Sequence, residues 1–305
     1  NFNSKVTDIY IDTGKITGIR VNDEYDEEFN AVVLAPGHSA RDTFEMLLKK
    51  GVEMEKKSFA VGMRIEHNQS LINNFAYGRD DNGSLPVADY KVTAKAGNNR
   101  GVYSFCMCPG GYVVNASSMK EKTCVNGMSY SGRSGKNANS AIIVSVSPAD
   151  YGAQDPLDGM HFQETLEHKT YQLGNGKIPQ QLFGDYRQNI ASQGYGDFNS
   201  QTKGQTCFAN LRGLMTEDME HSFLLGMEHF SNIIPQFDRS DAILSGMETR
   251  TSSPVRIMRD TNGESRVHGI YPGGEGAGYA GGIMSAAMDG LRLADDVMKR
   301  YHPVY

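Results

Sequence analysis

The chain has 305 residues and a formal net charge of −6. This length suffices for two domains, and an acidic balance without a basic stripe argues against nucleic acid as the main partner. Four cysteines in so long a chain do not form a disulfide framework, so we expect a cytoplasmic protein. No apolar run approaches the roughly 20 residues that span a bilayer.

The N-terminal segment has strand patterns. β-branched residues alternate on both sides of a Thr13-Gly14 turn, which predicts a hairpin over residues 5–21. The acidic residues 22–30 then indicate a second turn and a short strand.

A strand and a helix are predicted next. The apolar residues 31–34 end at a Pro-Gly break, which is typical of a buried strand. Ser39 is the expected N-cap of the following helix, and Gly51 is its expected end. Residues 31–51 therefore form a strand–turn–helix unit, the elementary piece of an open α/β sheet.

Beyond about residue 57 the pattern indicates a mostly antiparallel sheet. Residues 59–65 alternate apolar with small or polar side chains, as in a half-buried strand. Residues 66–89 are rich in loop formers, and the Ser, Gly and Asn residues of 126–140 predict a mobile loop. Further strands are predicted at residues 90–94, 102–105, 112–116 and 141–146.

Helical periodicity returns in the second half of the chain. We expect one helix over residues 158–174 and a second that Thr216 caps and Pro235 stops, with little regular structure over 184–210. The last helix, over 283–297, carries small and apolar residues on one face. The predicted fold class is α/β, with an α+β insert.

Residues 269–283 hold seven glycines immediately before the last helix. Dense glycine lets a large group approach the backbone, and a helix N-terminus offers free N–H groups and the positive end of a dipole. The natural ligand is a phosphate or another electron-rich group of a cofactor, because Glu275 and Tyr279 lie within the run. The alternative is a flexible loop before a surface helix.

Two segments resemble motifs of flavoproteins of the glutathione reductase type. Residues 31–37 are similar to their hydrophobic strand and Ala-Thr-Gly, with Pro36 in place of the Thr. Residues 267–276 are similar to their late motif, in which a strand leads to Gly-Asp or Gly-Glu. Nearly the whole chain resembles a family of bacterial FAD-dependent dehydrogenases. The segments that carry this resemblance are residues 103–111, 248–256 and 272–283.

This resemblance implies where FAD would bind. The segment 35–37 would lie near its adenine side, and Glu275 would hydrogen-bond the ribityl chain. The N–H groups of 281–283 would face the pyrimidine edge of the flavin and stabilise negative charge on its reduced form. The implied cofactor-binding residues are Ala35, Pro36, Gly37, Gly273, Gly274, Glu275, Gly276, Gly278, Tyr279, Gly281, Gly282 and Ile283.

One part of the family pattern is not found at its usual place in this sequence. Flavoproteins of this type open with a strand and a G-x-G-x-x-G turn that holds the FAD pyrophosphate, and none of the strand patterns in the first 60 residues leads into such a turn. The spacing does occur at residues 276–281, but there it belongs to the late glycine stretch. The sequence opens on Asn1 and passes directly into a strand pattern. We therefore expect the C-terminal part of a flavoenzyme, which binds FAD weakly or not at all by itself. Its uncovered apolar faces, on the last helix and on strand 31–34, predict either self-association or a rearranged or disordered segment around 273–283.

The resemblance also implies a domain organisation and an activity. Residues 1–56 and 250–305 would form a partial FAD-binding domain, and residues 57–249 an inserted substrate or cap domain. The parent protein would be an FAD-dependent dehydrogenase or oxidoreductase that transfers a hydride or electrons between a small-molecule substrate and the flavin, with NAD(P) as a candidate electron partner. The alternative is a non-enzymatic binding module on a flavoprotein-like scaffold.

The sequence offers few catalytic candidates, namely Cys108, Arg250 and Arg256. Cys106 and Cys108 form either a redox-active thiol site or two small residues at a hairpin tip, and we favour the second because a C-x-C pair makes an awkward disulfide. The two arginines hold an anionic substrate or a flavin phosphate, or else they lie on the surface without a ligand. The histidines lack metal-ligand spacing, although His38 is a candidate for a polar contact with the cofactor.

Overall fold

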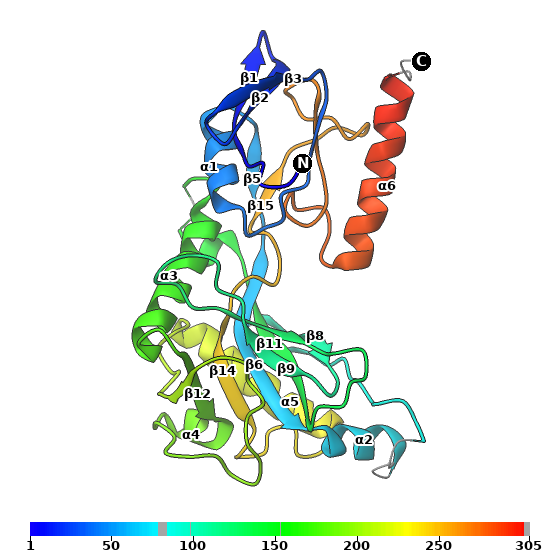
Figure 1. The fold of residues 1–305 in the computed structure, drawn as a ribbon. Coiled ribbons are helices and arrows are strands. Elements are labelled where there is room, and N and C mark those ends of the chain that lie inside the picture. Colours follow the sequence, from blue (N-terminus) through cyan, green and yellow to red (C-terminus); the bar gives the residue numbers. More distant parts are fainter. Residues whose placement is uncertain (79–83, 98, 153, 302–305) are drawn as a thin grey trace. The chain divides into compact units, whose positions relative to one another are not determined.

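The chain is described by a computed structural model covering residues 1–78, 84–97, 99–152 and 154–301 (Figure 1). The fold is mixed α/β, as predicted, and it divides into two compact units. Unit 1 consists of Asn1–Phe59, Ser147–Phe162 and Ser252–Tyr305, and unit 2 consists of Ala60–Val146 and Gln163–Thr251. Unit 1 is therefore assembled from three separate stretches of sequence.

Unit 1 opens with an antiparallel meander that confirms the predicted hairpin. Its strands are β1 (Val6–Asp12), β2 (Lys15–Val21) and β3 (Tyr25–Glu28). Thr13 and Gly14 both have positive φ, at 48° and 78°, which suits the tight turn between two strands. One face of the meander buries Ile9 and Ile16 in the unit's core.

Besides residues 147–162, two strand pairs and two whole α-helices complete unit 1. They are β4 (Val32–Leu34) with β16 (Ile270–Pro272), β5 (Met54–Lys56) with β15 (Val255–Ile257), α1 (Arg41–Lys49) and α6 (Ile283–Arg300). The core gathers Phe44 and Leu47 of α1 with apolar residues of all three stretches. The N-cap of α1 is Ala40, so Ser39 is not the cap; Asp42 instead supplies the negative charge that the dipole favours in the first turn.

Unit 2 is built on a seven-stranded sheet with the order β13-β12-β14-β6-β11-β8-β7. β12 and β13 run parallel, whereas β12–β14, β14–β6, β11–β8 and β7–β8 run antiparallel. The strands are β6 (Phe59–Asn68), β7 (Thr93–Lys95), β8 (Gly101–Cys108), β11 (Asn137–Val146), β12 (Ile178–Leu182), β13 (Thr206–Phe208) and β14 (Ile243–Glu248). A separate antiparallel pair joins β9 (Tyr112–Asn115) to β10 (Val125–Met128).

The described helices of the rest of the chain are α2 (Gln69–Tyr77), a short 3-10 helix (Pro148–Asp150), α3 (Asp158–Gly174), α4 (Phe183–Gln188) and α5 (Glu217–Ile233). The bounds of α3 are those predicted. The side chain of Thr216 accepts a hydrogen bond from the Met219 N–H and caps α5, which ends before Pro235, also as predicted. Within the described residues, none of the helices combines the length and apolarity needed to cross a bilayer.

Several sequence predictions for unit 2 are wrong. β6 is buried on both faces rather than one, because the polar side chains on its second face are satisfied by partners inside the unit. The segment 66–89, of which residues 79–83 lie outside the described part, contains α2. The segment 126–140 contains most of β10 and the start of β11, and 184–210 contains most of α4 and all of β13. β8 and β9 form no hairpin, since each pairs with other strands.

Candidate functional site

The two segments that resemble cofactor motifs meet at one edge of unit 1. β4 and β16 pair in parallel, with Leu34 opposite Pro272, and the Gly273 N–H donates to the Leu34 carbonyl at 2.8 Å. Because parallel neighbours end at the same edge, 35–37 and 273–276 begin side by side. Ala35, Pro36 and Gly37 are exposed there, whereas Gly276 is buried.

Gly276 shows how closely these two segments approach each other. A Cβ at this position would lie 2.6 Å from both the carbonyl carbon and the oxygen of Gly37, so no larger residue fits. The Ser253 hydroxyl donates to the Gly276 carbonyl at 2.9 Å from the other side. The contact between the segments is therefore a backbone-to-backbone one that glycine alone permits.

Four ionisable side chains gather around this contact. The carboxylate of Glu275 lies 2.8 Å from Nδ1 of His38, and both side chains remain partly exposed. Burial and the charge of Arg256 lower the pKa of Lys57, while the charge of Glu275 opposes that shift. The edge thus carries a carboxylate hydrogen-bond acceptor beside two cations, which suits a ligand with both hydroxyl and anionic groups.

The glycine stretch is held from below by an ion pair. Asp289 of α6 lies 2.5 Å from Arg259, and it accepts the Gly274 N–H at 2.8 Å. The guanidinium of Arg259 also donates to the Pro272 carbonyl at 2.8 Å and lies 3.6 Å from the centre of the Tyr279 ring. The stretch is a shaped turn with fixed hydrogen bonds rather than a flexible loop.

The stretch leads into the N-terminus of α6. Gly282 is the N-cap, no side chain caps the helix, and its first turn has no acidic residue. A Cβ at Gly281 or Gly282 would meet nothing within 4 Å, and Ile283 is 89% exposed. The first N–H groups of a helix lack intrahelical partners, so this end is open to an electron-rich ligand.

Gly278 and Tyr279 form the turn between the contact at Gly276 and the N-terminus of α6. Gly278 has a φ of 87°, and a Cβ there would lie 2.6 Å from the Val255 carbonyl oxygen. The Tyr279 hydroxyl donates to the Ile257 carbonyl at 3.0 Å, and its ring lies under both Arg256 and Arg259. Tyr279 therefore contacts protein on its polar end and supports the turn.

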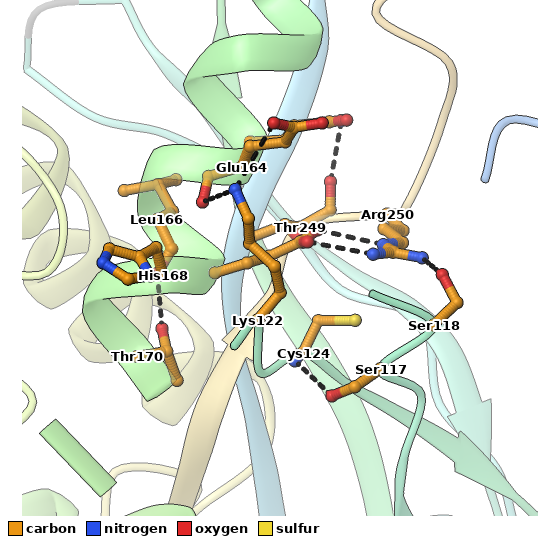
Figure 2. A network of polar contacts seen from close by, with 12 residues as sticks. Ser117, Ser118, Lys122, Cys124, Glu164, Leu166, His168, Thr170, Thr249 and Arg250 are labelled. Carbon is orange, nitrogen blue, oxygen red and sulfur yellow. Dashed lines mark hydrogen bonds and ion pairs between the residues drawn. The ribbon is translucent and has the colours of Figure 1, made fainter. Parts of the chain in front are cut away.

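Arg250 has a different environment, inside unit 2 (Figure 2). Its Nε and Nη2 donate to the two carboxylate oxygens of Glu167, each at 2.9 Å, and its Nη1 donates to Ser118. Glu167 also accepts from the Thr249 hydroxyl at 2.7 Å. Burial alone would lower the pKa of Arg250, but Glu167 holds it above the ordinary value. This guanidinium is committed to a buried ion pair.

Cys108 also belongs to unit 2, where it lies buried beside Arg64. Among the predicted residues, the structure therefore brings 35–37 and 273–283 together with Arg256, and it places Arg250 and Cys108 in the other unit.

Sequence reasoning missed Lys57, Arg259 and Asp289. Their roles depend on contacts between segments far apart in the sequence. The one available signal was an acid, Asp289, within the small and apolar first turns of the last helix.

Comparisons with known proteins agree with a flavoprotein family. A family model described as "FAD-dependent protein, C-terminal domain-like" matches residues 58–251, which is more than half of the chain. An uncharacterized protein of Clostridium beijerinckii is 46% identical over 307 residues; the alignment covers 99% of this chain and 57% of that protein. The chain thus spans little more than half the length of this relative.

Among solved structures, the quinol fumarate reductase of E. coli shares 14% identity, with 97% of this chain and 44% of that chain covered and a TM-score of 0.33. A score this low carries no structural argument. The family match alone is sufficient to show that the chain belongs to the FAD-dependent proteins with this C-terminal domain.

Proposed function

We propose that this chain supplies one wall of the FAD site of an oxidoreductase, at the edge where β4 and β16 end. The observation that carries the proposal is the meeting of the exposed 35–37 segment with the glycine stretch, at a backbone contact that only glycine permits. The open N-terminus of α6 lies at the end of that same stretch.

The residues present fit the chemical groups of FAD. Exposed backbone at 35–37 would contact its adenine side. Glu275, whose second carboxylate oxygen keeps acceptor capacity beside the His38 contact, would accept hydrogen bonds from the ribityl hydroxyls. The N–H groups of 282 and 283 would donate to the pyrimidine edge, while the Gly281 N–H donates to the Ser285 hydroxyl at 3.2 Å. The exposed Arg256 with Lys57 would attract anionic groups.

Each of these protein groups has a physical task in the proposed site. The flavin, when bound, supplies the capacity to exchange a hydride or single electrons with a substrate. The α6 N-terminus favours negative charge at its first turn, and the ion pair between Arg259 and Asp289 keeps the glycine stretch in place. The substrate is proposed to be a small molecule, and NAD(P) stays a proposed electron partner.

The test is an FAD titration of the purified complete gene product and of its Glu275→Gln variant. Loss of a charge-assisted hydrogen bond costs about 1.5–3 kcal/mol, so the variant should bind FAD roughly tenfold or more weakly. Glu45→Gln, at an exposed position of α1, is the matched control and should leave the affinity unchanged.

Two further outcomes separate the alternatives. We expect the 305-residue chain alone to bind FAD weakly, because none of the N-terminal strands leads into a G-x-G-x-x-G turn for the pyrophosphate, and the same spacing at residues 276–281 lies in the stretch proposed to contact the flavin end. Full flavin occupancy of this chain would contradict that expectation. A complete gene product without flavin would instead favour a non-enzymatic binding module. If flavin is bound, its reduction by NADH or NADPH and its reoxidation by quinones or oxygen identify the electron partners.

A further inference from the structure

Cys106 lies at an irregularity in the sheet of unit 2. In the pairing of β8 with β11, Phe105 is opposite Ala141 and Cys108 is opposite Asn139, so two residues of β8 face one of β11. The extra residue forms a β-bulge, and Cys106 has a φ of 46°, in the left-handed region. Such backbone costs of order 1–3 kcal/mol for a residue other than glycine. The bulge exposes the Cys106 thiol, whereas Cys108 is buried.

A buried arginine contacts both cysteines. Arg64 of β6 is completely buried, and its Nη2 donates to the Cys106 carbonyl and lies 3.4 Å from the sulfur of Cys108. Its Nη1 lies 2.6 Å from the carboxylate of Glu248, and its Nε donates to Asn139 at 2.9 Å. Nη1 also donates to the Asn126 side chain at 3.2 Å. These contacts hold the guanidinium in place, so the positive charge stays beside the Cys108 sulfur.

The neighbouring backbone packs tightly against the cluster of Arg64, Cys106 and Cys108. A Cβ at Gly127 of β10 would collide with Nη2 of Arg64 and with the Asn139 side chain. The Cys108 thiol donates to the Cys106 carbonyl, with sulfur and oxygen 3.3 Å apart. The same arginine therefore holds the Cys106 carbonyl and the Cys108 sulfur, although neither cysteine belongs to the proposed FAD site.

We propose that Cys106 and Cys108 form a thiol–disulfide exchange pair whose substrate class is a small disulfide, with the exposed Cys106 as the attacking thiol and the buried Cys108 as the resolving thiol. This role needs no flavin, so it is independent of the function proposed above.

The reaction balances in two steps. The Cys106 sulfur attacks one sulfur of a disulfide R–S–S–R and forms a mixed disulfide; the proton of Cys106 leaves with the first R–SH. The Cys108 sulfur then attacks the Cys106 sulfur, and its proton leaves with the second R–SH. The two protein thiols are oxidised to a disulfide, and the substrate disulfide is reduced to two thiols.

The environment of Cys108 suits the second step. Its interaction with Cys106 and its burial raise the pKa of the Cys108 thiol, whereas the charge of Arg64 lowers it. In a mixed disulfide the interaction with the Cys106 thiol is lost, while burial and the charge of Arg64 remain. The order of attack follows from exposure, because a disulfide in solution reaches Cys106 before the buried Cys108.

The spacing of the two residues permits the bond. Residues two apart in a strand have Cα atoms about 6.6 Å apart, within the range of about 4.4–6.8 Å found in disulfides. The left-handed backbone of Cys106 departs from that of a regular C-x-C strand, and the Cys108 sulfur already lies 3.3 Å from the Cys106 carbonyl oxygen.

The experiment treats the reduced 305-residue chain with dithiodipyridine and follows thiopyridone release by absorbance and the product by peptide mass spectrometry. A Cys207→Ser background removes the other partly exposed thiol. The pair should release two thiopyridones, and its peptide should lose two hydrogens without an adduct. Cys108→Ser should halve the release and leave a stable adduct on Cys106, and Cys106→Ser should abolish the release.

In the protein that retains both Cys106 and Cys108, a thiopyridine adduct that persists on Cys106 would overturn the proposal. Absence of any reaction of these two thiols with dithiodipyridine would also overturn it. This result is read on the chain with both cysteines, so it stands even if a variant fails to fold. Circular dichroism shows whether each variant is folded, and only the thiopyridone release of folded variants is compared with that of the chain with both cysteines.

Discussion

At the scale of single residues, Asp289 connects the glycine stretch to the last helix. It is a buried acid on a helix whose other described buried residue is Leu293. Burial alone would raise its pKa, but Arg259 and the Gly274 N–H stabilise the carboxylate and hold the pKa below the ordinary value of 3.8. A residue of this kind contributes to stability only while it is ionised.

The ionisation of Asp289 makes the stability of the protein depend on pH. The folded-state pKa of Asp289 lies below its unfolded value, so the stabilisation is fully present above about pH 4 and is lost as the pH falls through the folded-state pKa. Asp289→Asn should therefore lower the free energy of unfolding by about 1–3 kcal/mol at pH 7 and by less in acid.

Urea unfolding of both proteins at pH 7 and at pH 3 measures this difference. Asp295→Asn, at an exposed position of the same helix, is the control and should change little at either pH. A difference for Asp289→Asn that stays constant between the two pH values would show that the ion pair is not its cause.

At the scale of elements, the pairing of β4 with β16 determines the geometry of the proposed site. Gly276→Ala places a methyl group against the backbone of Gly37, and backbone atoms cannot turn aside as a side chain can. We expect a loss of about 1–3 kcal/mol in the free energy of unfolding, as for overpacked cores.

Chemical denaturation of the variant tests this expectation. Gly290→Ala is the matched control, because a Cβ there meets nothing within 4 Å and alanine favours the helix, so its stability should rise by about 0.4–1 kcal/mol. Wild-type stability for Gly276→Ala would mean that the two segments are farther apart than described.

The elements that sequence alone predicted are those fixed by local chemistry. The Thr13-Gly14 turn and the Thr216 cap act within a few residues, and their signals are visible in the sequence. β11 was missed at its start because Asn137 and Asn139 resemble loop residues, although both are buried among hydrogen-bond partners. Hydrogen bonds between side chains that are distant in the sequence leave no signal in the local sequence pattern.

At the scale of the whole molecule, the same limit applies to the candidate site. Its glycines and Glu275 were identified from the density of glycine before a helix and from resemblance, but Lys57, Arg259 and Asp289 could not be placed, since their roles arise from tertiary contacts. The order of the seven strands in unit 2 was likewise beyond reach, because strands distant in the sequence are neighbours there.

The exposed face of α6 leads to a prediction about assembly. Its exposed apolar side chains include Ile283, Met284, Met288 and Leu291, with Leu291 70% exposed. We propose that this face drives self-association of the chain, since large exposed apolar patches commonly mark interfaces. Light scattering after size-exclusion chromatography should then give masses above 33.5 kDa that rise with concentration.

Leu291→Gln combined with Met288→Gln should return the chain to a monomer. Arg292→Gln, an exposed change on the same helix, should leave the association unchanged. A wild-type chain that is monomeric at all concentrations would remove this proposal.

The parallel pair of β4 and β16 also has a consequence during synthesis. Val32 leaves the ribosome long before its partner Ile270, and all of unit 2 is translated between them. β4 therefore remains without its partner strand while the whole of unit 2 is synthesised. A chaperone that binds extended apolar segments could therefore bind residues 31–34 during all of this time. Its binding site is covered only after β16 and the glycine stretch have been synthesised.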